Sequence, residues 1–94
     1  LYTDLGLLTS NREIGADVAE LFNLLTGYSG QQSWRKILVA PVNMRQEFLR
    51  LIQEAIAAHT PALPSRIRLV MNSLVDQEMI QALYRASAAG VRVQ

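Results

Sequence analysis

The side chains able to do chemistry in this chain are few. It has a single histidine, His59, and no cysteine among 94 residues. The absence of cysteine excludes disulfides and thiolate metal sites. His59 precedes Thr60 and a proline at the expected end of a helix, where an imidazole can interact with the last helix carbonyls. We therefore predict a structural role for His59 rather than a catalytic one.

The acidic residues form no evident acid–base pair. Glu13 and Asp76 stand at positions typical of helix caps, and Glu78 lies in a first helical turn, where its charge favours the helix dipole. Four other helical acids are expected to face solvent: Asp17, Glu20, Glu47 and Glu54. The sequence contains no glycine-rich phosphate loop, paired metal-ligand histidines or nucleophile elbow. General motifs therefore predict no catalytic residue and no metal ligand.

Arginine dominates the basic residues, with eight Arg against one Lys. The planar guanidinium fork suits phosphate and carboxylate. Genomic base composition, which also accounts for the many alanines, explains the same excess, so both interpretations stand. The net charge of +1 creates no field strong enough to indicate nucleic acid or an anionic membrane as a partner.

One segment, 71–76, is placed where ligands collect. It is expected to join the carboxyl end of a strand to the amino terminus of a helix, and in open parallel sheets ligands bind at that edge. Asn72 can either hold a ligand there or bridge the backbone groups of the turn. The turn role is the simpler interpretation.

Hydrophobic spacing predicts the elements that position these residues. Three helices are expected: 12–26 behind a Ser10–Glu13 capping box, a second from an Asn43 cap to Pro61, and a third from an Asp76 cap to Gly90. Strand-like runs cover 2–9, 36–40, 66–71 and 91–93. Strands and helices that alternate through short connections indicate parallel pairing. We predict an α/β fold of strand–helix units with a mostly parallel sheet.

The chain is expected to be a piece of a longer protein, because it opens and closes inside strand-like runs. Half of its residues are hydrophobic, which suits a folded core. No apolar run reaches the roughly 20 residues that span a bilayer, and no secretory signal is present. The polar, turn-forming connector after Gly27 is the best candidate for a domain boundary.

Five stretches, in order along the chain, resemble the long, histidine-phosphorylating polyphosphate kinases. They are 1–9, 21–28, 38–45, 71–76 and 82–87. The resemblance implies a parent enzyme that reversibly moves the terminal phosphate of ATP onto inorganic polyphosphate through a phosphohistidine. It implies that 1–32 ends the penultimate domain and that 33–94 begins the C-terminal domain, both with a phospholipase-D-like fold.

The same resemblance places most functional groups outside this chain. The phosphorylated histidine, a second histidine and the arginines that hold Mg²⁺ would lie before Leu1, and further nucleotide contacts would lie beyond Gln94. The isolated chain is therefore expected to be inactive. Tyr2 alone falls on a family position that contacts ATP; its alternative is a strand aromatic packed against the sheet.

The partners implied by the resemblance are ATP, ADP and polyphosphate, with no nucleic acid and no transmembrane segment. The parent is expected to be a cytoplasmic homo-oligomer, with peripheral membrane association left open. A second interpretation is a non-catalytic α/β interaction or regulatory module with a flavodoxin-like pattern. The missing aspartate cluster of receiver-type modules counts against it.

Overall fold

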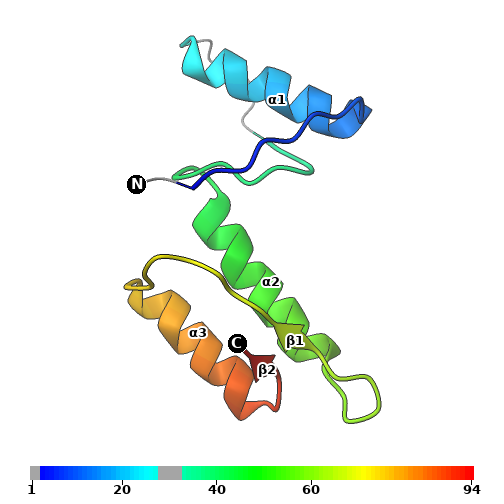
Figure 1. Cartoon of the computed structure of the whole chain (residues 1–94), viewed down its shortest axis with the longest axis vertical. Helices are drawn as coiled ribbons and strands as arrows, with labels where there is room; N and C mark the ends of the chain where they lie inside the picture. The colour runs from blue at the N-terminus through cyan, green and yellow to red at the C-terminus, as the bar shows by residue number, and fades with distance from the viewer. Residues whose placement is uncertain (1–2, 28–32) are drawn as a thin grey trace. The chain divides into compact units, whose positions relative to one another are not determined.

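The computed structural model describes residues 3–27 and 33–94 of the chain. Its elements, in chain order, are three helices and two short strands (Figure 1). They fall into two compact units, Leu1–Ala40 and Pro41–Gln94.

The first unit contains one helix, α1 (Arg12–Leu25). Its N-cap is Asn11, whose side chain accepts a hydrogen bond from the Ile14 amide at 3.0 Å. The predicted Ser10 cap is therefore wrong by one residue, since asparagine caps as well as serine does. Gly27 ends this segment with a φ of 82°, as its predicted role as terminator requires.

Neither strand predicted in this unit is present in the described residues. Residues 3–9 form no strand, and large side chains such as Leu5 and Leu8 are fully exposed. Residues 36–40 are also not a strand. A strand needs a partner with which to exchange backbone hydrogen bonds. The amides of residues 35–37 instead donate to the carboxylate of Asp17.

The second unit is built from α2 (Met44–Ala58), β1 (Arg66–Ile67), α3 (Gln77–Ala88) and β2 (Arg92–Val93). The two strands pair in parallel, with Arg66 opposite Arg92 and Ile67 opposite Val93. Two flanking bonds continue the pairing, from the Leu69 amide to the Gln94 carbonyl at 2.8 Å and from the Gln94 amide to the Ile67 carbonyl at 2.9 Å. This strand–helix–strand connection is the parallel unit that the sequence predicts.

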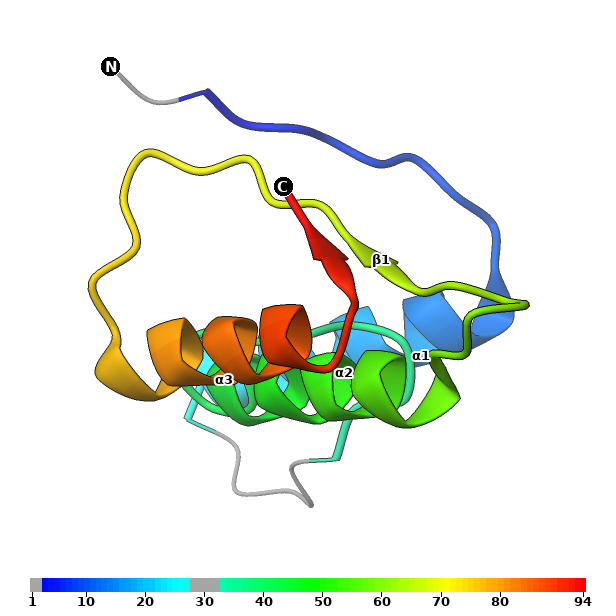
Figure 2. The same ribbon diagram turned by 90° about the horizontal axis from the view of Figure 1, so that it is seen from below.

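Both helices of this unit lie on one side of the strand pair, as Figure 2 shows. The core between them is centred on the inner face of α3. Its buried members are Ile52, Met79, Ala82, Leu83, Ala86 and Val91. Apolar residues of the strands, Ile67 and Val93 among them, pack against this cluster. Alternation along a strand therefore directs their neighbours Arg66 and Arg92 to the opposite face, where both are exposed.

The ends of α2 and α3 meet at His59 and Gly90. His59 is the C-cap of α2, and its Nδ1 accepts a hydrogen bond from the Ser65 amide at 3.0 Å. Its role is thus structural, although the partner is this amide rather than the predicted helix carbonyls. Gly90 ends α3 with a φ of 96°, and a Cβ built there would lie 2.9 Å from His59 Nε2. Position 90 therefore excludes a side chain for two separate reasons.

The outcome is an α/β arrangement in which helices dominate. All three predicted helices are present, and each predicted boundary lies close to the observed one. The strands are the weaker part of the prediction, since 66–71 contracts to Arg66–Ile67 and 91–93 to Arg92–Val93. The Asn43 residue is the N-cap of α2, but its side chain makes no capping hydrogen bond.

We expect Gly90→Ala to lower the free energy of unfolding of the Pro41–Gln94 unit. The left-handed backbone alone costs an alanine about 1–2 kcal/mol, and the contact with His59 adds to this cost. Urea unfolding followed by circular dichroism measures the change. Gly15→Ala is the control, because Gly15 is helical with open space around it, and alanine there should stabilise by about 0.5–1 kcal/mol. A Gly90→Ala chain as stable as the wild type would contradict this account.

Candidate functional site

The amino terminus of α3 lies at the carboxyl end of the strand pair, the edge that the sequence singles out. Asp76 is its N-cap, and Asp76 Oδ1 accepts from the Met79 amide at 2.9 Å. Arg45, from the first turn of α2, donates to both carboxylate oxygens of Asp76, at 2.7 and 3.2 Å. The same guanidinium lies 3.2 Å from Glu78. One arginine thus ties the starts of two helices together.

These contacts set the electrostatics of the α3 terminus. The hydrogen bond from Arg45, followed by that from the Met79 amide, lowers the pKa of Asp76 below its ordinary value. The two carboxylates in turn raise the pKa of Arg45, chiefly through the Asp76 hydrogen bond. A helix start that already holds two ionised carboxylates repels further anions. The terminus of α3 is therefore a structural joint, and Arg45 is already neutralised.

Asn72 lies in the same segment and behaves differently. Its side chain is exposed and makes no hydrogen bond within the described part of the chain. The simpler of the two predicted roles, bridging the backbone of the turn, is therefore wrong. The other role, holding a ligand at the strand edge, stays a prediction.

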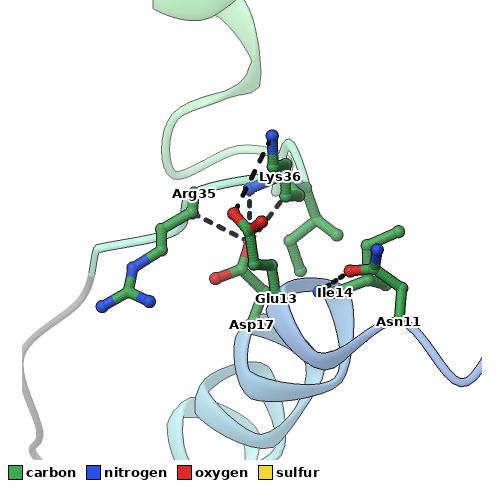
Figure 3. Close-up of polar contacts among 7 residues, drawn as sticks. Asn11, Glu13, Ile14, Asp17, Arg35 and Lys36 are labelled. Carbon is green, nitrogen blue, oxygen red and sulfur yellow. Dashed lines mark hydrogen bonds and ion pairs between the residues drawn. The ribbon is translucent and has the colours of Figure 1, made fainter.

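The first unit holds a carboxylate whose position was predicted incorrectly. Asp17, expected to face solvent, is 3% exposed and is the buried residue of α1. Its Oδ2 accepts three consecutive backbone amides, from Arg35 at 2.8 Å, Lys36 at 2.5 Å and Ile37 at 3.1 Å (Figure 3). Glu13, one turn earlier on α1, lies 3.8 Å from the Lys36 ammonium. Asp17 therefore fixes the segment after the connector onto α1.

The pKa of Asp17 is lowered from its ordinary value of 3.8. The hydrogen bond from the Lys36 amide is the largest cause, and it acts together with the Arg35 and Ile37 amides against the opposing effect of burial. Three hydrogen bonds to one carboxylate oxygen favour the ionised form over the neutral acid, which is the weaker acceptor. Sequence spacing cannot reveal this contact, because backbone amides 18 to 20 residues away carry no side-chain signal.

Among the described residues, two hollows in the surface are candidate sites, each lined by one unit. The one between α2 and α3 has a volume of about 390 Å³. It is lined by apolar and polar side chains: Leu49, Ile52, Gln53, Ile56, Glu78, Gln81, Ala82 and Arg85. The one beside α1, of about 220 Å³, is lined by Asp17, Glu20 and Arg35 among others. The lining of the hollow between α2 and α3 includes no nucleophilic side chain. The hollow beside α1 includes Ser33 together with Asp17 and Glu20, but Asp17 Oδ2 is already engaged by three backbone amides. Neither hollow therefore has the arrangement of a nucleophile activated by a free base.

The remaining predicted site residue is Tyr2, which lies outside the described residues. Within residues 3–27 and 33–94, no group of three or more His, Cys, Asp or Glu is placed to hold a metal ion. Over the same residues, none of the helices combines the length and the apolar character needed to cross a bilayer.

Comparison with known proteins connects this architecture to one family. The model of "Polyphosphate kinase C-terminal domain 2" matches residues 37–94, well over half of the chain. Curated proteins named polyphosphate kinase are similar along essentially the whole chain. The identity is 53% over 94 residues for that of Mycobacterium avium strain 104 and 50% over 98 residues for that of Mycobacterium leprae strain TN. It is 50% over 93 residues for that of Thermosynechococcus vestitus.

The chain spans about 13% of the length of each of these three relatives, while they cover 99–100% of the chain. The comparison with solved structures found no significant match to this chain.

We expect Asp17→Asn to destabilise the Leu1–Ala40 unit at neutral pH. Because the folded pKa is lowered, the stabilisation by Asp17 is present above pH 3.8 and is lost as the pH falls through the folded value. The variant should therefore have a lower urea midpoint at pH 7 and a flatter pH dependence below pH 4. Trp34 is the single tryptophan and lies in this unit, so its fluorescence reports the transition.

Glu20→Gln is the matched control for Asp17→Asn, since it removes the same charge from α1 without touching the three amides. Its midpoint should stay close to that of the wild type at pH 7. Equal midpoints for Asp17→Asn and the wild type would show that the carboxylate does not hold the segment.

Proposed function

The chain belongs to the polyphosphate kinase family, and from this premise we propose that it forms part of an enzyme that transfers the terminal phosphate of ATP reversibly to inorganic polyphosphate. The observation that carries the proposal is the similarity along the whole chain to proteins named polyphosphate kinase. This similarity also argues against the flavodoxin-like regulatory module considered from the sequence.

The reaction is proposed to pass through a phosphohistidine that lies in the parent enzyme and outside this chain. His59 is not that residue, because its Nδ1 is engaged by the Ser65 amide and its Nε2 faces Gly90. Phosphoryl transfer depends on positioning and on stabilising charge, with little covalent work for other side chains. The role proposed for this chain is therefore to provide part of the α/β framework and of the substrate-binding surface.

The finer architecture is also a proposal. We assign 1–32 to the end of the penultimate domain, 33–94 to the start of the C-terminal domain, and both to a phospholipase-D-like fold. The family match over 37–94, together with the parallel β1–α3–β2 unit, supports this assignment. The family match begins at residue 37 and the second compact unit begins at Pro41, both a few residues after the proposed division.

The cofactor and location follow the same premise. Mg²⁺ would neutralise phosphate charge in such a reaction. The described residues do not fit a magnesium site, so its ligands are proposed to lie elsewhere in the parent enzyme. The parent is proposed to be a cytoplasmic homo-oligomer that acts on ATP, ADP and polyphosphate, and peripheral contact with a membrane is compatible with this proposal.

Phosphorus NMR with ATP and long-chain polyphosphate tests the activity. The full-length parent enzyme should convert ATP to ADP as the internal polyphosphate signal grows, whereas the purified 94-residue chain should give no turnover. A parent enzyme that leaves both signals unchanged, with Mg²⁺ supplied, would refute the proposed function. Turnover by the isolated chain would refute the assignment of the reactive histidine to another part of the parent.

Tyr2 is proposed to contact ATP, through its ring against the base or its hydroxyl to a phosphate. Tyr2→Ala in the parent enzyme should raise the KM for ATP about tenfold, the loss expected for one good contact of roughly 1.4 kcal/mol. Tyr2→Phe separates the ring from the hydroxyl. Tyr84→Ala is the control, since Tyr84 is exposed on α3. An unchanged KM in Tyr2→Ala would favour the alternative, a tyrosine that only packs against the sheet.

A further inference from the structure

The face of the strand pair turned away from the core carries three arginines, which we call the arginine face: Arg66, Arg68 and Arg92. All three are exposed. Ile67 and Leu69 pack against the core, so the alternating residues Arg66 and Arg68 point to the other side of β1. The Leu69–Gln94 and Gln94–Ile67 hydrogen bonds continue the pairing past Arg68, which keeps the alternation intact.

The register brings these arginines close together. Arg66 lies directly opposite Arg92 in the parallel pair. Neighbouring strands are about 4.8 Å apart, and alternate residues on one strand are about 6.6 Å apart. Like charges directly opposite each other on adjacent strands are unfavourable. A pair of arginines in this position therefore favours a bound anion that neutralises both.

No acidic side chain of the Pro41–Gln94 unit compensates this charge. The unit has four acidic residues, and each is paired with an arginine of α2. Asp76 and Glu78 bind Arg45. Glu47 lies 2.7 Å from Arg50, and Glu54 contacts the same guanidinium. The arginine face makes no ion pair within the described residues, so its guanidinium groups keep their full binding capacity.

We propose that the arginine face binds the inorganic polyphosphate chain of the parent enzyme, a proposal that rests on the proposed function. Several guanidinium forks spaced by a few ångströms suit a linear polyanion that presents a phosphate at every repeat. Composition alone left two explanations for the excess of arginine, phosphate binding and genomic base composition. For three of the eight arginines, this proposal selects phosphate binding. Arg45 and Arg50 instead have structural roles, because both form ion pairs with acidic side chains.

A bare phosphate chain fits this face better than a nucleic acid does. Proteins that bind single-stranded nucleic acid combine basic residues with aromatic side chains on which the bases stack. Residues 60–83 and 85–94, which include both strands and their flanking segments, contain no aromatic side chain. The face therefore offers charge and hydrogen-bond donors without a stacking platform.

The test uses the full-length enzyme with Arg66→Gln, Arg68→Gln and Arg92→Gln combined. We expect the Kd for long-chain polyphosphate to rise about tenfold or more, since three partly exposed charge contacts are lost. By analogy with counterion release from nucleic acids, the slope of log Kd against log salt should fall by about two to three. The KM for ATP should not change. The charge-preserving triple Arg→Lys variant should bind within about threefold of the wild type.

The matched control removes three other exposed arginines, by Arg12→Gln, Arg35→Gln and Arg85→Gln. It lowers the net charge equally and should leave the Kd for polyphosphate within about twofold. A tenfold loss in this control as well would mean that net charge, and not the arginine face, sets the affinity, which would overturn the inference.

Other outcomes separate the inference from the proposed function. If the wild type turns over polyphosphate and the triple Gln variant binds it equally well, the inference fails and the function stands. If the wild type neither binds nor turns over polyphosphate, both the inference and the proposed function fail.

Two further results bear on the arginine face itself. If the triple Gln variant has a lower Tm and the triple Lys variant does not recover polyphosphate binding, another part of the protein covers this face. Loss of single-stranded oligonucleotide binding with unchanged polyphosphate binding would assign the face to nucleic acid. Either result overturns the inference.

Discussion

The buried face of α3 is the feature on which the rest of the Pro41–Gln94 unit depends. Ala82 and Ala86 are one helical turn apart and are 2% and 0% exposed. Side chains this small let neighbouring elements approach closely, and any larger group would overfill the space. The same helix carries the Asp76 cap at one end and the Gly90 turn at the other, which returns the chain into β2. The buried face of α3 therefore contacts both α2 and the two strands.

Charge is divided between two sides of this unit. Asp76 and Glu78 pair with Arg45, which joins the start of α2 to the start of α3, whereas Glu47 and Glu54 pair with Arg50 within α2 itself. The two strands contain arginines and no acidic residue, so a chain with a net charge of only +1 still has a locally basic surface. Net charge averaged over all residues therefore hides the feature that bears on function. Placement of the acids, more than the number of arginines, determines where an anion can bind.

The success of sequence reasoning here depends on whether a feature is local. Helices are set by spacing and caps within a few residues, so α1, α2 and α3 were predicted nearly to their ends. Strands need partners distant in sequence, and residues 3–9 and 36–40 are not strands in the described part of the chain. Asp17 was misplaced for the same reason, because its partners are backbone amides. The arginine face emerged only with the register of β1 and β2.

The central structural claim is that α3 and the strand pair form one cooperative unit. Native-state amide hydrogen exchange of the chain tests it most directly, with Leu69 reporting on the strands, Val91 on the turn and Leu83 on α3. The account predicts that the three amides exchange with the same free energy of opening and lose protection together as denaturant is added. Rapid exchange at Leu69 and Val91 while Leu83 stays protected would contradict it.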